Sequence, residues 1–355
     1  MHSLLTGLCL TIAASTLASA QTPSIALQRT ESIAPAPGFR PWQSPSTSSK
    51  PPLTGGLWFP ATGASATDLL FDTAIFKGVS VQTEAAIRPG RWPLVLLSHG
   101  TGGSWRSLSW LGAGLAQQGA VVVAVNHPGS TFGDYDMRRS LDHGSRVNDL
   151  TTVLNVILTD AAIGSYVDPL RVFVAGFSLG GWTALSMGGL RGDLNAYANY
   201  CAHSGHRHCR DIARAGIDLM QLDASAWNRS YRDPRVRAVA AIDPGLHQGL
   251  TAEQTTDMVG KVLLIGLGQG PDRLPDTDFS PRTSALLQIL PDVRMEVLVP
   301  AFHFSALPLC KPAGPEILAA DNDDPVCSDP PGTDRQALHE RISETIASHF
   351  GLGLR

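Results

Sequence analysis

The chain has 355 residues, of which 43% are hydrophobic and only 16% are charged, with 35 Gly, 25 Pro and five Cys. This hydrophobic content excludes a globally disordered chain, because disordered chains are more polar and more charged. Twenty-seven basic and 31 acidic residues give a net charge of −4, with no basic block. We therefore expect no nucleic-acid partner, since nucleic acid is bound by a concentrated positive surface.

The first twenty residues have the pattern of a secretory signal. Residues 4–17 form an apolar stretch without Asp, Glu, Lys or Arg, and Ala18, Ser19 and Ala20 follow. This predicts a signal peptide over residues 1–20 that is cleaved before Gln21. Neither this run nor any later one has the length that a membrane span needs. We therefore expect a secreted or periplasmic protein with no transmembrane segment after cleavage.

Cleavage of this signal would remove Cys9 and leave four cysteines, Cys201, Cys209, Cys310 and Cys327. In an exported protein, four thiols predict two disulfides, and we expect the pairs to follow chain order. Three histidines near the first pair raise a zinc site as an alternative, but no standard zinc spacing is present. We expect no metal and no other cofactor.

After the signal, residues 21–55 are rich in Pro, Ser and Thr and predict an extended arm. From residue 56 to 355, apolar runs that predict buried strands alternate with apolar residues at helical spacing. This alternation predicts one α/β domain with a parallel sheet covered on both faces. The predicted strands are 94–98, 120–125, 171–175, 237–242, 262–267 and 295–299. The predicted helices are 105–118, 147–158, 179–190 and a last one that starts at a capping box of Thr333 and Gln336 and ends at Gly351.

One long insertion interrupts this alternation between the helix 179–190 and the strand 237–242. Residues 191–235 contain Cys201, Cys209 and a predicted helical run near 212–220. A connection does not need that length, so we interpret the insertion as a cap over the carboxyl edge of the sheet. The alternative is a surface elaboration away from the functional site.

A G-x-S-x-G motif, formed by residues 176–180, lies directly between a predicted strand and a predicted helix. This context is typical of a nucleophile elbow, in which the serine stands on a sharp turn above the sheet. Gly176 and Gly180 keep side chains away from that turn, and the following helix N-terminus favours a negative charge. We predict Ser178 as a nucleophile, with an N-cap serine in a glycine-rich turn as the alternative.

A nucleophilic serine needs a base, and the base needs an orienting acid. His303 follows the strand 295–299 and is the predicted base, whereas His247 lies too close to the acid's own strand. Asp243 directly ends the strand 237–242, and Asp272 lies in the loop after the next strand. The residues favour Asp243 as the acid and leave Asp272 as the alternative.

The glycine-rich loop after the first buried strand supplies the last piece of the predicted site. Residues 98–103 read Ser-His-Gly-Thr-Gly-Gly, the equivalent of an HGGG-type loop that includes Gly100. The backbone N–H groups of Thr101 and Leu179 are the predicted oxyanion hole. We expect His99 to brace the loop rather than act as a base. An ordinary glycine-rich turn is the alternative.

These segments resemble, in unbroken order, the platelet-activating-factor acetylhydrolase family and its bacterial relatives known as predicted dienelactone hydrolases. The resemblance covers roughly residues 55–350 and is carried by residues 93–100, 176–181, 240–243 and 302–304. It implies an α/β-hydrolase fold with Ser178 as nucleophile, His303 as base and an acid after the sixth strand, which matches Asp243. It also implies that the Thr101 and Leu179 amides bind the oxyanion.

The sequence departs from this family in two places. Phe177 stands where the family often has His, and the cysteine-bearing cap and the tail 310–327 have no match in the lipid-acting members. The natural substrate is therefore not carried over. We predict an exported esterase- or lipase-like serine hydrolase that cleaves a short-acyl ester, a lactone or a lipid ester through an acyl-enzyme. The alternative is a catalytically silent protein of this fold that binds a hydrophobic ligand under the cap. A peptidase of this fold would normally carry a further large domain, which we do not expect.

Overall fold

The computed structural model describes residues 36–46, 51–63 and 66–353. The predicted signal peptide, with Cys9, and part of the predicted arm lie outside the described residues. One sheet of eight strands organises the fold, in the order β1-β2-β6-β5-β9-β10-β11-β12. Strand β1 pairs antiparallel with β2, and β2 antiparallel with β6, whereas every other pair in this sheet is parallel.

The strands of the sheet are β1 (Gly38–Gln43), β2 (Thr54–Phe59), β5 (Trp92–Ser98), β6 (Val121–Val125), β9 (Val167–Phe177), β10 (Val236–Ile242), β11 (Val262–Leu267) and β12 (Val293–Leu298). Two short ribbons pair β3 (Asp68–Leu70) with β4 (Val79–Val81) and β7 (Ser130–Thr131) with β8 (Asp134–Tyr135). The α-helices are α1 (Ser109–Gln117), α2 (Met137–Leu141), α3 (His143–Thr159), α4 (Leu179–Met187), α5 (Leu194–Ser204), α6 (Arg207–Arg214), α7 (Ala224–Asn228), α8 (Leu286–Ile289), α9 (Gly314–Ala320) and α10 (Arg335–Phe350). The 3₁₀ turns are η1 (Trp105–Leu108), η2 (Gly164–Tyr166), η3 (Leu219–Gln221), η4 (Ala252–Thr255), η5 (Gly270–Asp272), η6 (Pro275–Thr277) and η7 (His303–Ala306).

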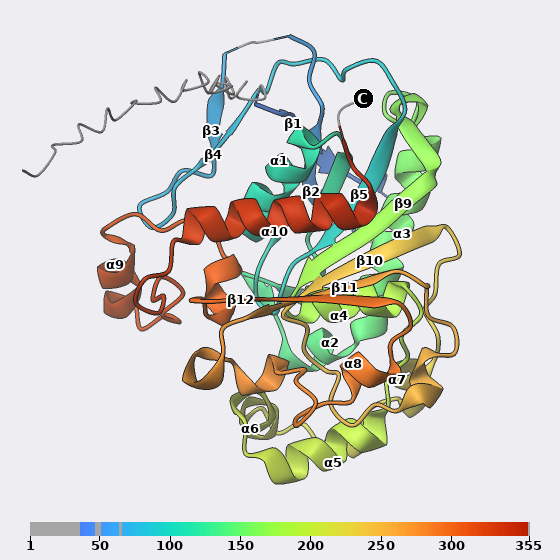
Figure 1. Cartoon of the computed structure of the whole chain (residues 1–355), viewed down its shortest axis with the longest axis vertical. Helices are drawn as coiled ribbons and strands as arrows, with labels where there is room; N and C mark the ends of the chain where they lie inside the picture. The colour runs from blue at the N-terminus through green and yellow to red at the C-terminus, as the bar shows by residue number, and fades with distance from the viewer. Residues whose placement is uncertain (1–35, 47–50, 64–65, 354–355) are drawn as a thin grey trace, which may run out of the picture. The chain divides into compact units, whose positions relative to one another are not determined.

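Helices cover both faces of the sheet, and the strand side chains divide between two apolar cores. Along β5, Leu94 and Leu96 pack in the core that includes α3 and α4, whereas Val95 and Leu97 pack in the core of α1 and α10. Figure 1 shows α10 running across one face of the sheet. The mostly parallel sheet with helices on both faces confirms the predicted α/β class, because side chains buried on both faces require cover on both.

The folded domain begins earlier in the chain than predicted. Strand β1 lies within the predicted arm 21–55, where it pairs along its length with β2. Pro41 in the middle of β1 hides the strand in the sequence, but β1 is the edge strand, where a missing N–H is tolerated.

Two predicted helix features are also corrected. Helix α10 begins after Asp334, whose side chain accepts from the Ala337 N–H, so the predicted capping box of Thr333 and Gln336 is wrong. The helical run predicted near 212–220 ends at Arg214 and resumes only as the short turn η3.

The insertion 191–235 folds into α5, α6, η3 and α7, which gather below the sheet in Figure 1. A disulfide between Cys201 and Cys209 joins α5 to α6. The His208 N–H donates to Asp276 Oδ2 (3.5 Å), in the loop after β11. A Cβ on Gly249, in the loop after β10, would lie 2.7 Å from the Ala196 side chain. The insertion therefore packs on loops that leave the carboxyl ends of β10 and β11.

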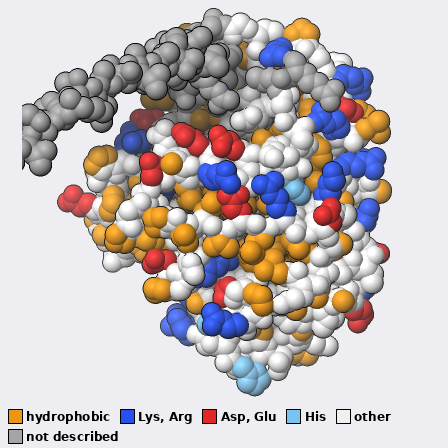
Figure 2. All heavy atoms as spheres, in the orientation of Figure 1, with side chains coloured by type: hydrophobic (Ala, Val, Ile, Leu, Met, Phe, Trp, Pro, Cys, Tyr) orange, Lys and Arg blue, Asp and Glu red, His pale blue; other side chains and the backbone are white. Residues whose placement is uncertain are grey.

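The surface carries both signs of charge. Figure 2 shows Lys and Arg side chains interspersed with Asp and Glu over the face in view, between apolar patches. Among the helices of the described residues, none has the length and apolar character needed to cross a membrane.

Candidate active site

Ser178 stands at the turn between β9 and α4 in a backbone conformation that few residues adopt. Its φ is +57° and its ψ is −121°, a left-handed conformation that costs free energy for a residue with a side chain. The glycines around it are sterically required, because a Cβ on Gly176 would collide with Gly180 O, and one on Gly180 with Ser98 O. The Ser178 N–H donates to Ile242 O (2.9 Å), which ties the turn to β10.

The structure brings the predicted base and acid to this serine. His303, the first residue of η7, has its Nε2 3.1 Å from Ser178 Oγ and its Nδ1 2.6 Å from Asp243 Oδ2. In the tautomer that fits, Nδ1–H donates to the carboxylate and Nε2 accepts from the serine hydroxyl. The arrangement can therefore move the serine proton onto an oriented imidazole.

Asp243 directly follows β10, has φ +48° and is completely buried. Its carboxylate accepts from the Leu267 N–H (3.0 Å), the Thr277 hydroxyl (2.8 Å) and Arg273 Nη1 (2.5 Å). Burial acts to raise the pKa of Asp243, but the hydrogen bond from His303 and the Arg273 charge outweigh burial and hold this pKa below its usual value. The carboxylate is therefore ionised beside His303.

The two rival residues lie elsewhere. Asp272 is exposed in η5, and among the described residues no hydrogen bond or ion pair joins its side chain to His303. His247 is buried with Nδ1 2.9 Å from Ser284 Oγ, and burial lowers its pKa to about 4. The structure thus brings Asp243, and not Asp272, to His303.

The predicted oxyanion loop passes against the nucleophile. A Cβ on Gly100 would lie 3.1 Å from Ser178 Cβ. Within the described ranges, the Thr101 N–H has no hydrogen-bond acceptor. Leu179 is the first residue of α4, where N–H groups have no partner within the helix. Two backbone donors are thus available beside the serine.

His99 holds this loop from inside the protein. Its Nδ1 is 2.7 Å from Gly100 O, and its Nε2 lies 3.2 Å from Thr131 Oγ1. Burial, and then the neighbouring Arg146 charge, lower the pKa of His99 well below its usual value. These contacts are those of a neutral histidine that fixes the loop.

A second Ser–His–Asp array lies beneath the same loop. Ser98 Oγ is 2.9 Å from His127 Nε2, and His127 Nδ1 is 3.0 Å from Asp149 Oδ2. Buried Arg146 donates to Ser98 Oγ (3.1 Å), Thr183 Oγ1 (3.1 Å) and Ser130 Oγ (2.6 Å), and also to His99 O. Sequence reasoning missed this array, because its members come from β5, the loop after β6 and α3.

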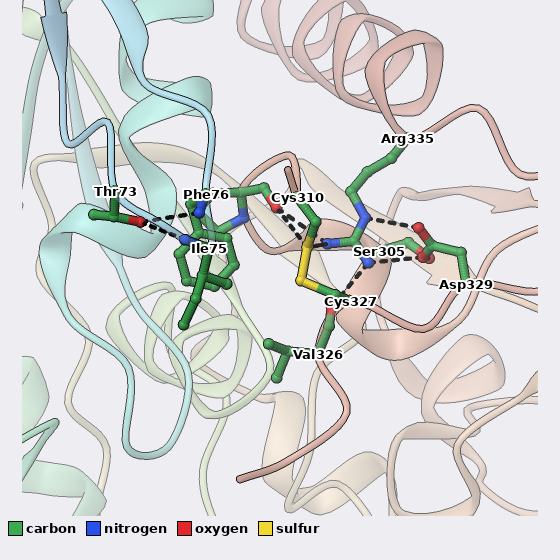
Figure 3. Close-up of a disulfide and its surroundings, with 10 residues drawn as sticks. Thr73, Ile75, Phe76, Ser305, Cys310, Val326, Cys327, Asp329 and Arg335 are labelled. Atoms are coloured by element: carbon green, nitrogen blue, oxygen red, sulfur yellow. Dashed lines mark hydrogen bonds and ion pairs between the residues drawn. A yellow bond between two sulfur atoms is a disulfide. The ribbon is translucent and has the colours of Figure 1, made fainter. Parts of the chain in front are cut away.

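The chain after His303 braces the turn that carries the base (Figure 3). The Ser305 hydroxyl, in the same turn, donates to Asp329 Oδ1 (2.6 Å), and Arg335 holds both oxygens of Asp329 at 2.9 Å. Cys310 and Cys327 form a disulfide beside Arg335, which also donates to Pro308 O and Val326 O. Both disulfides join the cysteines that the sequence pairs in chain order.

A cavity of about 530 Å³ lies beside the oxyanion loop and does not include Ser178. Its walls come from β1, β2 and the loops after β5 and β6, and include Trp42, Trp105, Arg106, Asn126 and Phe132. Across the described residues, no group of three or more His, Cys, Asp or Glu side chains is arranged to hold a metal ion.

Two family models match parts of the chain. The prolyl oligopeptidase family matches residues 99–205, and platelet-activating factor acetylhydrolase, isoform II, matches residues 64–133. Among curated proteins, cutinase est2 of Thermobifida alba is 34% identical over 165 residues, which are 43% of this chain and 52% of that protein. Cutinase est1 of the same organism is 33% identical over 144 residues, which are 39% of this chain and 45% of that cutinase. The chain spans about half the length of these curated relatives.

A solved structure agrees with this similarity over most of the chain. A ferulic acid esterase from Streptomyces cinnamoneus superposes with a TM-score of 0.55 at 20% identity, covering 90% of each chain. At this identity the superposition shows the fold. Together with the sheet order, the elbow at Ser178 and the two family matches, it identifies the chain as a member of the α/β-hydrolase superfamily that resembles the platelet-activating-factor acetylhydrolases.

Proposed function

We propose that this protein is a serine hydrolase that cleaves carboxylic esters. One observation carries the proposal. A continuous chain of hydrogen bonds runs from Ser178 through His303 to Asp243, and it starts at a serine held at positive φ on a strand-to-helix turn. That geometry exposes a nucleophile, gives it a base and orients the base.

The reaction follows from these positions. His303 Nε2 takes the proton of Ser178 as its Oγ attacks the ester carbonyl, and Asp243 stabilises the imidazolium that forms. The Thr101 and Leu179 N–H groups hold the oxyanion of the tetrahedral intermediate. His303 then protonates the departing alcohol, which leaves an acyl group on Ser178. A water activated by the same histidine releases the acid.

The substrate is an ester of a short acyl chain, a lactone or a lipid ester. The curated relatives are named cutinases, and Lipase 1 of a Moraxella species is 34% identical over 90 residues, which are 25% of each chain. The cavity beside the oxyanion loop, with Trp42, Trp105 and Phe132 in its walls, offers apolar surface to one side of such an ester. The insertion 191–235 serves as the cap. The two disulfides fit an oxidising compartment and support export.

Hydrolysis and labelling test the proposal directly. The protein is expected to hydrolyse p-nitrophenyl acetate and butyrate, and an organophosphate is expected to add one phosphoryl group to the peptide that contains Ser178. A series of acyl lengths then identifies the preferred ester. If the folded protein neither hydrolyses these esters nor takes the label, the proposal fails and a ligand-binding role under the cap replaces it.

A further inference from the structure

The loop after β11 places a buried arginine on the oxygen of Asp243 that His303 does not use. Arg273 Nη1 lies 2.5 Å from Asp243 Oδ1, whereas His303 Nδ1 lies 2.6 Å from Oδ2. The side chains are 10% exposed for Arg273 and 0% for Asp243. One carboxylate is therefore shared between a permanent cation and the imidazole, with little water to screen either.

The site is shaped around this guanidinium. Arg273 Nη1 also donates to Leu267 O (3.1 Å), and Nη2 donates to Thr277 O (2.5 Å). The guanidinium carbon stands 4.7 Å from the centre of the Phe279 ring. On β11, a Cβ on Gly266 would lie only 2.8 Å from Arg273 Nη1 and 3.1 Å from the Phe279 ring. These contacts fix the guanidinium in one position, and that position fixes the carboxylate.

Other charged and titratable groups surround this cluster. Asp278, on the same loop, is 3.9 Å from Arg273 Nε, and His247, after β10, packs on Phe279. Behind η7, the Asp329–Arg335 pair reaches the turn through Ser305, and His339 of α10 lies 2.9 Å from Ser305 O. Among these groups in the described structure, Arg273 is the one paired with the carboxylate itself.

We propose that Arg273 is a positioning residue that orients Asp243 for His303. The inference rests on the proposed function. With the guanidinium on Oδ1, the carboxylate presents Oδ2 to His303 Nδ1. This contact holds the imidazole so that its Nε2 faces the Ser178 hydroxyl.

Arg273→Gln and Arg273→Lys separate charge from shape. In the Gln variant we expect kcat to fall about tenfold with KM nearly unchanged, since Asp243 Oδ1 loses its charged donor and keeps only the Leu267 N–H. The Lys variant keeps a cation for Oδ1 and is expected to recover most of the wild-type kcat.

A matched control lies at the other end of β10. Arg235 pairs with Asp233 at 2.6 Å, before the strand begins and away from the site. Arg235→Gln removes an arginine–aspartate pair of the same kind, and we expect its kcat and KM to match those of the wild type.

The outcome distinguishes this inference from the proposed function. If the wild type hydrolyses esters and Arg273→Gln keeps the wild-type kcat, the inference is overturned while the hydrolase stands. If Arg273→Gln does not fold, Gly266→Ala decides, since its Cβ displaces the guanidinium and keeps the charge in the chain. A lower kcat at unchanged KM in that variant supports the inference, and an unchanged kcat overturns it. A wild type without activity or label removes the proposed function itself.

Discussion

Two Ser–His–Asp arrays lie near the carboxyl edge of the same sheet, and their hydrogen-bond lengths hardly distinguish them. In the first, Ser178 Oγ to His303 Nε2 is 3.1 Å and His303 Nδ1 to Asp243 is 2.6 Å. In the array of Ser98, His127 and Asp149 the same two distances are 2.9 and 3.0 Å. Distances alone would therefore nominate both arrays as catalytic.

Exposure, backbone and the place of the positive charge separate the two arrays. Ser98 ends a buried strand and is completely buried, whereas Ser178 is partly exposed at a turn with φ +57°. In the buried array an arginine, Arg146, donates to the serine oxygen, so the charge sits at the end where a nucleophile would react. In the other array the arginine sits on the acid. The cation on Asp243 leaves the Ser178 hydroxyl unoccupied by positive charge, whereas Arg146 occupies the Ser98 oxygen.

Removing each serine gives the largest contrast between the arrays. We expect Ser178→Ala to lower kcat for p-nitrophenyl butyrate by about 10⁴-fold or more, because the nucleophile is lost. Ser98→Ala is expected to keep kcat within about tenfold and to lower the thermal midpoint, because Arg146 and His127 lose a partner. Comparable losses of kcat in both variants, with both folded, would contradict the assignment.

Neutralising each acid is the next test. Asp243→Asn is expected to lower kcat by about 10⁴-fold, since the amide no longer stabilises the imidazolium or selects its tautomer. Asp149→Asn is expected to lower the free energy of unfolding by about 1–2 kcal/mol, with kcat changed little, because His127 keeps its bond to Ser98. Urea unfolding and steady-state kinetics on both variants check this, and a folded Asp243→Asn enzyme at wild-type rate would refute it.

Lowering the pH is expected to destabilise the folded protein through its buried histidines. Burial lowers the pKa of His143, His247 and His339 to about 4, below the value of about 6.5 in an unfolded chain. The unfolded state then binds more protons, so stability falls as pH drops from about 6.5 towards 4. Each of these histidines is expected to lower the free energy of unfolding by about 2 kcal/mol as the pH falls from 7 to 5.

The buried array takes part in this acid response. Burial, followed by the Arg146 charge, lowers the pKa of His127 well below its usual value. We expect His127→Asn to flatten the dependence of the unfolding free energy on pH relative to the wild type. Urea unfolding at pH 7, 6 and 5 measures it, and a wild-type stability that stays constant over this range would disprove the expectation.

The two disulfides are expected to have the smallest effects on kcat. Cys310 and Cys327 are 17 residues apart, and Cys201 and Cys209 are 8 residues apart. Replacing either pair by serine is expected to lower the free energy of unfolding by about 2–3 kcal/mol. Cys310→Ser/Cys327→Ser is also expected to lower kcat several-fold, because its loop holds Arg335 and Asp329 behind the base. Cys201→Ser/Cys209→Ser is the control, with kcat near that of the wild type. Equal effects of both pairs on kcat would remove the distinction.

The sequence predicts the parts of the site that are continuous along the chain. The elbow at Ser178 could be read because its glycines, strand and helix are contiguous, and Asp243 because it ends a strand directly. Arg273 and Thr277 could not, since their loop looks like a solvated acidic stretch and only its path in space brings two donors onto Asp243. An arginine within an acidic loop is the signal that could have pointed to it.

The second array and the first strand escaped prediction for different physical reasons. His127 and Asp149 lie 29 and 51 residues from Ser98 in sequence, and their meeting depends on the packing of α3 under β5. Strand β1 contains Pro41, which argues against a strand unless its place at the sheet edge is known. The N-cap of α10 is Asp334, one residue after the predicted Thr333. This shift depends on where the chain turns into the helix.

The contacts that hold the turn of His303 come from residues that are synthesised after the Ser178 array itself. Every member of the Ser178 array has been synthesised by residue 303, yet the turn that carries the base is held by Asp329, Arg335 and His339, from the last part of the chain. A growing polypeptide therefore possesses all its reactive groups before it possesses the scaffold that aligns them. The Ser178 array would be aligned only when the final helix docks, and a chain that stops before Arg335 would carry all three residues of the array with His303 unanchored.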